Sequence, residues 1–532
     1  MSWTTRTAAV LVAGVLTACA DQPTAPIAAS GPAPRLATAG SNGNNGNGRS
    51  SLDLIEDDFD AGLLDRENVN RYREYAVSAP DRLPTKYRGA GVGKDATYSM
   101  VQLAKDWSTL SAATRKEIRD LRANGFGNLK DSVVTEHFVL HYTTQGDWAV
   151  PTRDNDRNGI PDFVDAAATS WEVIWTRQIG QLGYPAPKLT TDALGNPTNK
   201  FHVYFKDMPY YGYCVPENVE LLATSPVAYG TASAWIAVEN DFAGFPRNDE
   251  DVTGTETVRT GALKVTQAHE FMHAVQFNLN VYQSGWLMES HATWAEDAVY
   301  DRVNDWHWYI NGFLRTPDLP VQRRFVYGSA FFINWLSERY GQDTPLRIWK
   351  AAQTQTAIEA VRSVAFGGSW EPMKDFAEAQ ATFGLSDFTT DPASSVPVNR
   401  TLLVRTEHAA YPVDAAVAAA TKQVPNGAPW GLGTNYIEFV PGTASGDLTL
   451  TVDGADGYEW RAFALVTGAR GVETRQIALD AASETGTITV SGFGATRGAQ
   501  KVTLAVTIAA REGVQVPFSY SARVTPATLA RR

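Results

Sequence analysis

The spacing of apolar residues divides the chain into three regions, and the first of them, residues 51–130, has a helical pattern. Its opening apolar positions recur at the intervals of a helix that buries one face: Leu54, Ile55, Phe59, Leu63 and Leu64. Further on, Ser111 is a favourable N-cap for a helix over residues 112–123, with Gly125 as the expected stop. The region is predicted to be helical and to serve either as a buttress or as a propeptide. The buttress is favoured, because no processing point is evident.

The second region, residues 131–395, combines strands with helices. β-rich runs occur at residues 133–141, 201–205 and 233–238. Residues 267–277 form a later run without Gly or Pro, and a helix is its natural conformation. This region is predicted to fold as one domain with a sheet beside helices.

The third region, residues 396–532, is rich in Thr, Val, Ala and Gly, and its apolar residues alternate. The alternation is clearest at Leu448, Leu450, Val452, Val502, Leu504, Val506, Ile508, Phe518, Tyr520, Ala522 and Val524. Turns containing Gly separate these runs, which predicts an antiparallel β-sandwich. The chain as a whole is predicted to be α+β.

The length and charge of the chain narrow its possible partners. With 532 residues, the chain is long enough for two or three domains that each bury a core. The net charge of −12 is not gathered into long blocks, which argues against nucleic acid as a partner. The oligomeric state is not indicated.

The N-terminus predicts export. Arg6 precedes an apolar run over residues 8–16, which is too short to span a bilayer and is typical of a signal peptide. The run ends in Leu-Thr-Ala-Cys, which resembles the lipobox of bacterial lipoproteins. Residues 1–18 are therefore expected to be removed and Cys19 to be lipidated, which would anchor the protein to a membrane of the bacterial cell envelope. Cleavage without lipidation, giving a secreted protein, is the alternative.

Residues 19–50 are predicted to be a disordered tether. Pro, Ala and Ser give way there to a run of Asn and Gly, which cannot bury enough apolar surface to fold. If Cys19 is lipidated, Cys214 is the only remaining thiol, and no disulfide can form within the chain.

The central candidate for chemistry is the sequence His-Glu-Phe-Met-His at residues 269–273. In a helix, His269 and His273 lie on one face, one turn apart, where two imidazoles can bind the same zinc ion. Glu270 is then placed to take a proton from a water molecule at that ion. Ordinary packed histidines are the alternative, but only eight histidines occur in the chain.

A second helix-compatible segment follows, and a catalytic zinc site needs a third protein ligand. Its Trp-Leu-Met-Glu at residues 286–289, followed by Ala-Thr-Trp-Ala-Glu, resembles the second zinc helix of gluzincin metallopeptidases, most closely the M1 aminopeptidase branch. The resemblance implies a zincin-like domain in which Glu289 binds zinc and Glu296 supports the site from outside the metal shell. His291 is a competing ligand, but at ~100° per residue it points ~200° away from Glu289.

The same resemblance suggests two further roles, and it implies that an edge strand of the sheet pairs with the extended substrate. Tyr327 precedes a Gly-Ser-Ala helix start, where M1-type enzymes place a tyrosine that donates to the oxyanion; a core tyrosine is the alternative. Glu239 lies in Ala-Val-Glu-Asn at residues 237–240, a partial match to the M1 motif whose Glu holds a free amine. An exposed carboxylate at the end of a strand is the other interpretation of Glu239 and the one favoured.

Residues 154–165 resemble a calcium-binding EF-hand loop. Oxygen donors fall at the expected positions, with a glycine at the sixth: Asp154, Asp156, Asn158, Asp162 and Asp165, with the backbone carbonyl of Ile160. A structural Ca²⁺ site is predicted, and a solvated acidic turn is the alternative.

These features predict a zinc-dependent hydrolase of peptide bonds within residues 131–395, acting on peptides or proteins. An endopeptidase is favoured, and an aminopeptidase that uses Glu239 is the first alternative. The second alternative is a surface lipoprotein without activity, stabilised by its metals. The sequence leaves the role of the β-sandwich open.

Overall fold

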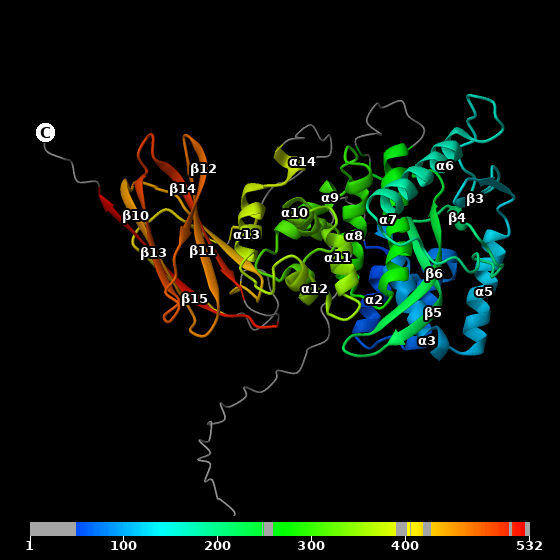
Figure 1. Cartoon of the computed structure of the whole chain (residues 1–532), viewed down its shortest axis with the longest axis horizontal. Helices are drawn as coiled ribbons and strands as arrows, with labels where there is room; N and C mark the ends of the chain where they lie inside the picture. Colours follow the sequence, from blue (N-terminus) through cyan, green and yellow to red (C-terminus); the bar gives the residue numbers. More distant parts are fainter. Residues whose placement is uncertain are drawn as a thin grey trace, which may run out of the picture. The chain divides into compact units, whose positions relative to one another are not determined.

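The computed structural model confirms a mixed α+β chain (Figure 1). It describes residues 49–246, 248, 259–389, 402–404, 406–418, 427–509 and 513–526. The predicted signal peptide, Cys19 and almost all of the predicted tether lie outside these residues. Within the described part of the chain, no helix has both the length and the apolar character to cross a bilayer.

The N-terminal region is helical, as its apolar spacing predicts. Its elements are α2 (Ser51–Asp60), α3 (Arg66–Ser78), β1 (Gly93–Asp95), α4 (Thr97–Asp106) and α5 (Ala112–Phe126), with 3-10 turns η1 (Pro80–Arg82), η2 (Thr85–Tyr87) and η3 (Trp107–Thr109). Ser111 caps α5 as expected, because its hydroxyl accepts the N–H of Thr114 at 3.1 Å.

The predicted stop of α5 at Gly125 is wrong, since the helix continues to Phe126 and ends at Gly127. Gly125 has a different role. A Cβ at this position would lie 2.7 Å from the ring of Trp148, so the glycine permits close packing instead of ending the helix.

A six-stranded mixed sheet forms the centre of the second region. Its order is β1-β5-β6-β4-β3-β2, and the strands are β2 (Asp131–Val134), β3 (Phe138–Tyr142), β4 (Phe201–Lys206), β5 (Tyr210–Ala223) and β6 (Tyr229–Glu239), in addition to β1. The three predicted β-rich runs lie in β2–β3, β4 and β6. Neither β5 nor β1 is predicted, because the sequence of β5 contains Gly and Pro and β1 has three residues.

Strand β6 is buried on both faces, and this places the sheet between two sets of helices. Trp235 and Ala237 belong to the core shared with the N-terminal helices, whereas Ile236 and Val238 belong to the core shared with α7 (Thr260–Asn280). Successive side chains in a strand point to opposite faces. The N-terminal helices therefore cover one face of the sheet and α7 covers the other.

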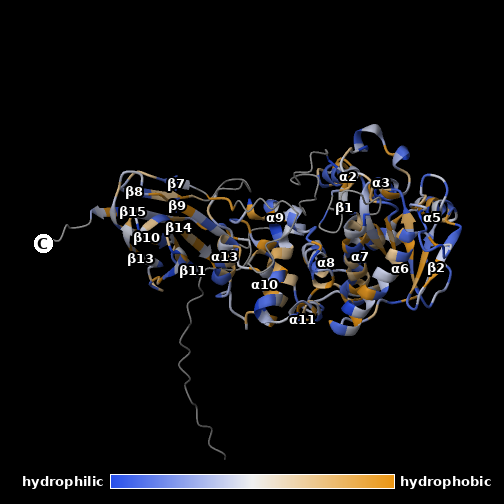
Figure 2. Cartoon of the chain, turned by 90° about the horizontal axis from the view of Figure 1, so that it is seen from above, coloured by the Kyte–Doolittle hydropathy of each residue, from blue (hydrophilic) through white to orange (hydrophobic). Residues whose placement is uncertain are grey.

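Further helices complete this region. They are α6 (Asp162–Trp175), the π-helix η4 (Thr176–Gln181), α8 (Gly285–Val299), α9 (His307–Leu314), η6 (Val321–Arg323), η7 (Tyr327–Ser329), α10 (Ala330–Tyr340), α11 (Thr344–Ala351), α12 (Ala357–Val364), α13 (Met373–Thr382) and α14 (Ser386–Thr389). Of these, α6, α8 and α11 pack directly against α7. Helix α10 buries eight of its eleven residues, and its apolar colouring is visible in Figure 2.

The C-terminal region is a β-sandwich. One sheet has the order β13-β10-β15-β8 and the other β12-β11-β14-β9-β7. The strands are β7 (Thr406–His408), β8 (Val413–Val417), β9 (Thr434–Phe439), β10 (Gly446–Gly454), β11 (Trp460–Gly468), β12 (Gly471–Ile477), β13 (Thr485–Phe493), β14 (Ala499–Ile508) and β15 (Phe518–Pro526). The antiparallel prediction fails at one pair, since the short edge strand β7 runs parallel to β9. Alternation along a strand sets which face is buried but not the direction of its neighbour.

Candidate metal centre

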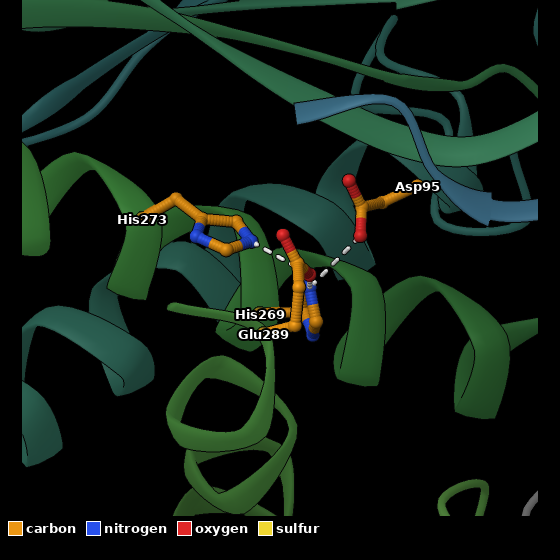
Figure 3. Close-up of side chains that lie close together, drawn as sticks. All are labelled: Asp95, His269, His273 and Glu289. Carbon is orange, nitrogen blue, oxygen red and sulfur yellow. Dashed lines mark hydrogen bonds and ion pairs between the residues drawn. The ribbon is translucent and has the colours of Figure 1, made fainter. Parts of the chain in front are cut away.

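Two helices bring the predicted ligands together (Figure 3). Helix α7 runs without interruption through His269 and His273, which lie one turn apart on the same face. Helix α8 begins after Ser284, whose hydroxyl accepts the N–H of Leu287, and it presents Glu289 within its first two turns. Thus both imidazoles and the carboxyl group approach one point.

The donor atoms at this point are close together. Oε2 of Glu289 lies 3.3 Å from Nε2 of His269 and 3.5 Å from Nε2 of His273. A fourth group, which the sequence does not predict, joins them: Oδ2 of Asp95 lies 3.5 Å from Nε2 of His269. One donor atom from each of the four residues lies within 4.8 Å of all the others.

The chemistry of these donors fits a divalent cation. Nε2 of His273 and Oε1 of Glu289 are buried and make no hydrogen bond to any described residue. A buried polar atom without a partner costs roughly 1–3 kcal/mol, so two of them in one cluster require an explanation. Imidazole nitrogen and carboxylate oxygen are ordinary zinc donors. His269, His273, Glu289 and Asp95 could therefore hold a zinc ion.

The far side of each imidazole is fixed by a hydrogen bond. Nδ1 of His269 lies 2.7 Å from Oε1 of Glu296, where a supporting carboxylate was expected. Nδ1 of His273 lies 2.8 Å from the side-chain oxygen of Gln276, which sequence reasoning missed. With each Nδ1 engaged in this way, Nε2 is directed toward the donor cluster.

Lys94 holds the supporting carboxylate in turn. Its ammonium group lies 3.0 Å from Oε2 of Glu296 and also pairs with Asp305, and all three side chains are almost completely buried. Removing one member of such a network leaves an uncompensated buried charge. In this arrangement, Lys94 of the N-terminal region helps to hold Glu296 against His269.

Glu270 lies beside the cluster but is not one of its donors. Its Oε2 accepts the hydroxyl hydrogen of Thr97 at 2.8 Å. A Cβ on Gly212 of β5 would lie 3.0 Å from Cγ of Glu270, so this glycine makes room for the carboxylate against the sheet. Burial, together with the charge of Asp95, raises the pKa of Glu270 to about 8. A carboxyl group with a pKa near neutrality is suited to accept and return a proton.

The electrostatics of the cluster favour positive charge. Burial lowers the pKa of His269, but hydrogen bonds to Asp95, Glu289 and Glu296 outweigh burial, and the pKa is raised well above its ordinary value. The pKa of His273 is also raised, because Glu289 opposes the effect of burial. The surrounding carboxylates thus stabilise a cation at this point, whether it is a proton or a metal ion.

Tyr327 points its hydroxyl group into the same cluster. The hydroxyl donates to Oδ2 of Asp95 at 2.8 Å, and the ring centroid lies 6.2 Å from that of His269. The side chain is also packed in the core, at 5 % exposure. The hydroxyl therefore lies where it could donate a hydrogen bond beside the donor cluster.

Two other candidates are engaged elsewhere. His291 is buried, and its Nε2 lies 2.7 Å from the hydroxyl of Tyr184. Glu239 ends β6, and its Oε2 accepts the backbone N–H groups of Asp241 and Phe242. The expectation that Glu239 is exposed is wrong, because it is 3 % exposed and closes a turn of the backbone.

Three of the aspartates that were predicted to bind calcium lie close together. Carboxylate oxygens of Asp154, Asp156 and Asp162 converge within 4.8 Å, and Oδ1 of Asp154 is buried without a hydrogen bond to a described residue. Asp165 does not join them; its Oδ2 instead accepts the side-chain N–H of Asn158 at 2.9 Å.

The rest of the loop follows the expected turn. Gly159 has φ +89°, the conformation that favours glycine, and its N–H donates to Asp154 at 3.0 Å. The N–H of Ile160 donates to Oδ1 of Asn158 at 2.7 Å. Helix α6 begins within this loop, at Asp162.

Three contributors from the N-terminal region escaped prediction. Lys94, Asp95 and Thr97 lie in or just after β1, far from α7 along the chain. No spacing rule connects them to His269. The local signal is limited to a short polar stretch between helices.

Comparison with models of protein families finds a match. The chain is similar, over residues 228–475, to a family described as a family of unknown function, DUF6055. The matched residues include α7, α8 and Tyr327, and they begin after Asp95. No curated protein matches the chain.

Proposed function

We propose that this chain is a zinc-dependent hydrolase of peptide bonds with a zincin-like catalytic domain. The convergence of His269, His273 and Glu289, with two buried donor atoms left without hydrogen bonds, carries the proposal. The position of Glu270 beside these donors supports hydrolysis over a purely structural role. An endopeptidase is favoured over an aminopeptidase, because the carboxylate of Glu239 is occupied by backbone N–H groups.

In this proposal each side chain has a separate role in hydrolysis. When bound, zinc supplies Lewis acidity toward water and toward the peptide carbonyl. Glu270 takes a proton from water as the water oxygen attacks the carbonyl carbon. Glu270 then passes that proton to the departing amine nitrogen as the C–N bond breaks. Tyr327, once free of Asp95, donates a hydrogen bond to the carbonyl oxygen as negative charge develops there.

The supporting residues keep the imidazoles in place. Glu296 and Gln276 face the Nδ1 atoms and fix the ring orientations, and Lys94 neutralises Glu296. The hydrogen bonds from Glu296 and Gln276 spare the two imidazoles the cost of reorganising during the reaction.

The proposal is tested by metal analysis and peptide cleavage with Glu270→Gln. The substitution keeps the size of the side chain but removes the base, so zinc content stays at the wild-type level and hydrolysis is lost. Because the centre is buried, the assay includes protein briefly treated with trypsin as well as intact protein. Cleavage by zinc-loaded Glu270→Gln at the wild-type rate would exclude this role. N-terminally blocked and free peptides, compared in the same assay, distinguish an endopeptidase from an aminopeptidase.

A structural zinc site in a surface protein without activity is the second candidate, and Asp95 favours it. Four protein donors are typical of structural zinc, whereas catalytic zinc keeps one position for water. The weakness of this candidate is Glu270, since a structural ion does not need a proton acceptor beside it.

A second ion site is proposed at residues 154–165. The converging oxygens of Asp154, Asp156 and Asp162 fit Ca²⁺, which prefers carboxylate ligands. A cation there would stabilise the start of α6. The proposed tether and lipid anchor of residues 1–50 would place the enzyme at a membrane of the bacterial cell envelope.

A further inference from the structure

Residues 93–97 occupy the edge of the sheet beside the metal centre. Strand β1 pairs in parallel with β5: the N–H of Gly93 donates to the carbonyl of Pro209 at 2.9 Å, and that of Ala96 to Gly212 at 3.3 Å. Without β1, β5 would be the edge strand. An extended peptide that adds to a sheet needs the N–H and C=O groups of an edge strand. Residues 93–97 therefore lie where a peptide substrate would be expected to bind.

Asp95 places a carboxylate directly at the metal donors. Its Oδ2 lies 3.5 Å from Nε2 of His269 and accepts the hydroxyl hydrogen of Tyr327 at 2.8 Å. The side chain of Asp95 is 3 % exposed. One carboxylate thus engages both the metal-binding face and the proposed oxyanion donor.

Thr97 engages the proposed base from the same segment. Its hydroxyl donates to Glu270 at 2.8 Å and accepts the N–H of Cys214 at 2.8 Å, which fixes it against β5. Lys94 anchors the segment on the opposite side through Glu296. The five-residue segment 93–97 consequently contacts groups assigned to metal support, proton transfer and oxyanion binding.

The centre is closed to solvent in this arrangement. His269 and Glu270 are 1 % exposed, and His273 is fully buried. A peptide cannot reach these groups unless covering residues move. Since residues 93–97 contact the groups directly, their displacement would free the donor cluster, the base and the sheet edge together.

On the basis of the proposed function, we propose that Asp95 is a fourth protein ligand of the metal and that residues 93–97 are an inhibitory segment. The segment holds the hydrolase in a latent form until it is displaced. This favours the propeptide interpretation of residues 51–130 over the buttress. A latent form also explains why this site has four protein donors although Glu270, the proposed base, lies beside it.

The test replaces Asp95 by Ala and uses Co²⁺ as a visible probe in the full chain. Asp81→Ala is the matched control, since Asp81 is an exposed aspartate of the same N-terminal region. Co²⁺ affinity is measured by chelator competition, and visible spectra are recorded with and without acetohydroxamate, a small metal-binding probe. We expect Asp95→Ala to lower the affinity by about tenfold or more and to make the spectrum respond to acetohydroxamate. Wild type and Asp81→Ala should not respond.

The outcomes separate this proposal from the proposed function. If Asp95→Ala matches wild type in affinity and in its response, Asp95 is not a ligand and the inference is overturned. His269→Ala is measured in parallel: if it retains wild-type Co²⁺ binding, the metal centre itself is wrong. If His269→Ala loses Co²⁺ and the Asp95 variants behave as expected, but no variant cleaves peptides, only the hydrolase assignment fails.

Two additions keep the test decisive. Asp95→Asn preserves the size of the side chain and a hydrogen-bond acceptor, so it replaces Asp95→Ala if circular dichroism shows that the alanine variant is unfolded. Latency is measured separately, by the cleavage of a quenched peptide. Asp95→Ala should cleave this peptide about tenfold faster than untreated wild type. Equal rates, together with a wild-type spectrum that already responds to acetohydroxamate, would show that the centre is not latent.

Discussion

The metal centre on α7 and the acidic loop at residues 154–165 differ in how their donors are brought together. The loop draws its converging carboxylates from nine consecutive residues, Asp154 to Asp162, with Asp156 exposed. The centre draws its donors from β1, α7 and α8, and the side chains of all four are almost completely buried. A loop of this kind depends on local turns, whereas the centre exists only when the N-terminal region, the sheet and two helices are packed.

This difference predicts unequal responses to substitution. Water screens the carboxylates of the loop, so losing one ligand there costs little beyond the ion itself. In the centre the dielectric constant is low, and a missing ligand leaves other buried groups without partners. The largest effects are therefore expected on α7 and the smallest in the loop.

The sharpest contrast comes from removing one donor at each site. His273→Ala should weaken zinc binding by more than about 100-fold, because it removes a ligand and not merely a supporting group. Asp154→Ala should leave zinc affinity unchanged. Competition with a chromogenic chelator measures both variants. Equal zinc affinity in His273→Ala and wild type would contradict the centre.

Tyr327→Phe tests whether the hydroxyl group that meets Asp95 also serves the reaction. In an Asp95→Ala background this hydroxyl has lost its partner and is free to meet substrate. Removing an oxyanion donor typically lowers kcat by about 100-fold or more, so a fall of that size is expected with unchanged zinc content. Tyr340→Phe, at the end of α10, is the control. Normal turnover in Tyr327→Phe would assign this residue to the core alone.

The donors that lie on helices could be predicted from the sequence, whereas the donor that depends on strand pairing could not. Helical spacing predicts that His269 and His273 share one face of α7, whereas Glu289 was expected from the resemblance to gluzincins; the structure brings these three side chains together. Asp95 escaped prediction, because its contact with His269 depends on the pairing of β1 with β5, which no local pattern specifies.

The same limit applies to the fold. The cap at Ser111 was predicted because it depends on neighbouring backbone groups. Gly125 was misinterpreted because its reason is Trp148, a tertiary neighbour. The parallel β7–β9 pair was missed because alternation does not encode strand direction.

Glu296→Gln tests a residue that contacts the ligand His269 but is not itself one of the metal donors. Loss of the charge that orients His269 should lower zinc affinity by about 10- to 100-fold. A similar pair outside the centre supplies the control: Nδ1 of His137 lies 2.6 Å from Oε2 of Glu172 on a half-exposed surface. Glu172→Gln should leave zinc affinity unchanged. Equal effects of the two substitutions would mean that Glu296 acts through general stability and not through the metal.

Glu239 is a buried carboxyl group outside the donor cluster, so it shows the effect of burial without that of a metal ion. Burial raises its pKa from 4.5 to about 8, so the folded state favours the protonated form. The stabilisation is complete below pH 4.5 and is lost as the pH rises to about 8. Glu239→Gln keeps an acceptor for the backbone N–H groups but does not ionise. It should exceed wild type in stability above pH 8 by roughly 2 kcal/mol or more and approach it at pH 4.5. If the difference in free energy of unfolding between Glu239→Gln and wild type is the same at all pH values, this prediction is wrong.

The calcium loop should give the smallest effect, and it tests which of its aspartates bind. At a Ca²⁺ concentration about ten times Kd, binding adds about 1.4 kcal/mol, which raises Tm by about 3–5 °C. Asp154→Ala should abolish this rise, because its oxygen belongs to the converging group. Asp165→Ala should retain much of it, because Asp165 is hydrogen-bonded to Asn158 instead. Calorimetry with and without Ca²⁺ measures the three proteins. If Asp165→Ala loses the whole rise, the twelfth position binds the ion as the EF-hand pattern predicts, and the loop must rearrange around it.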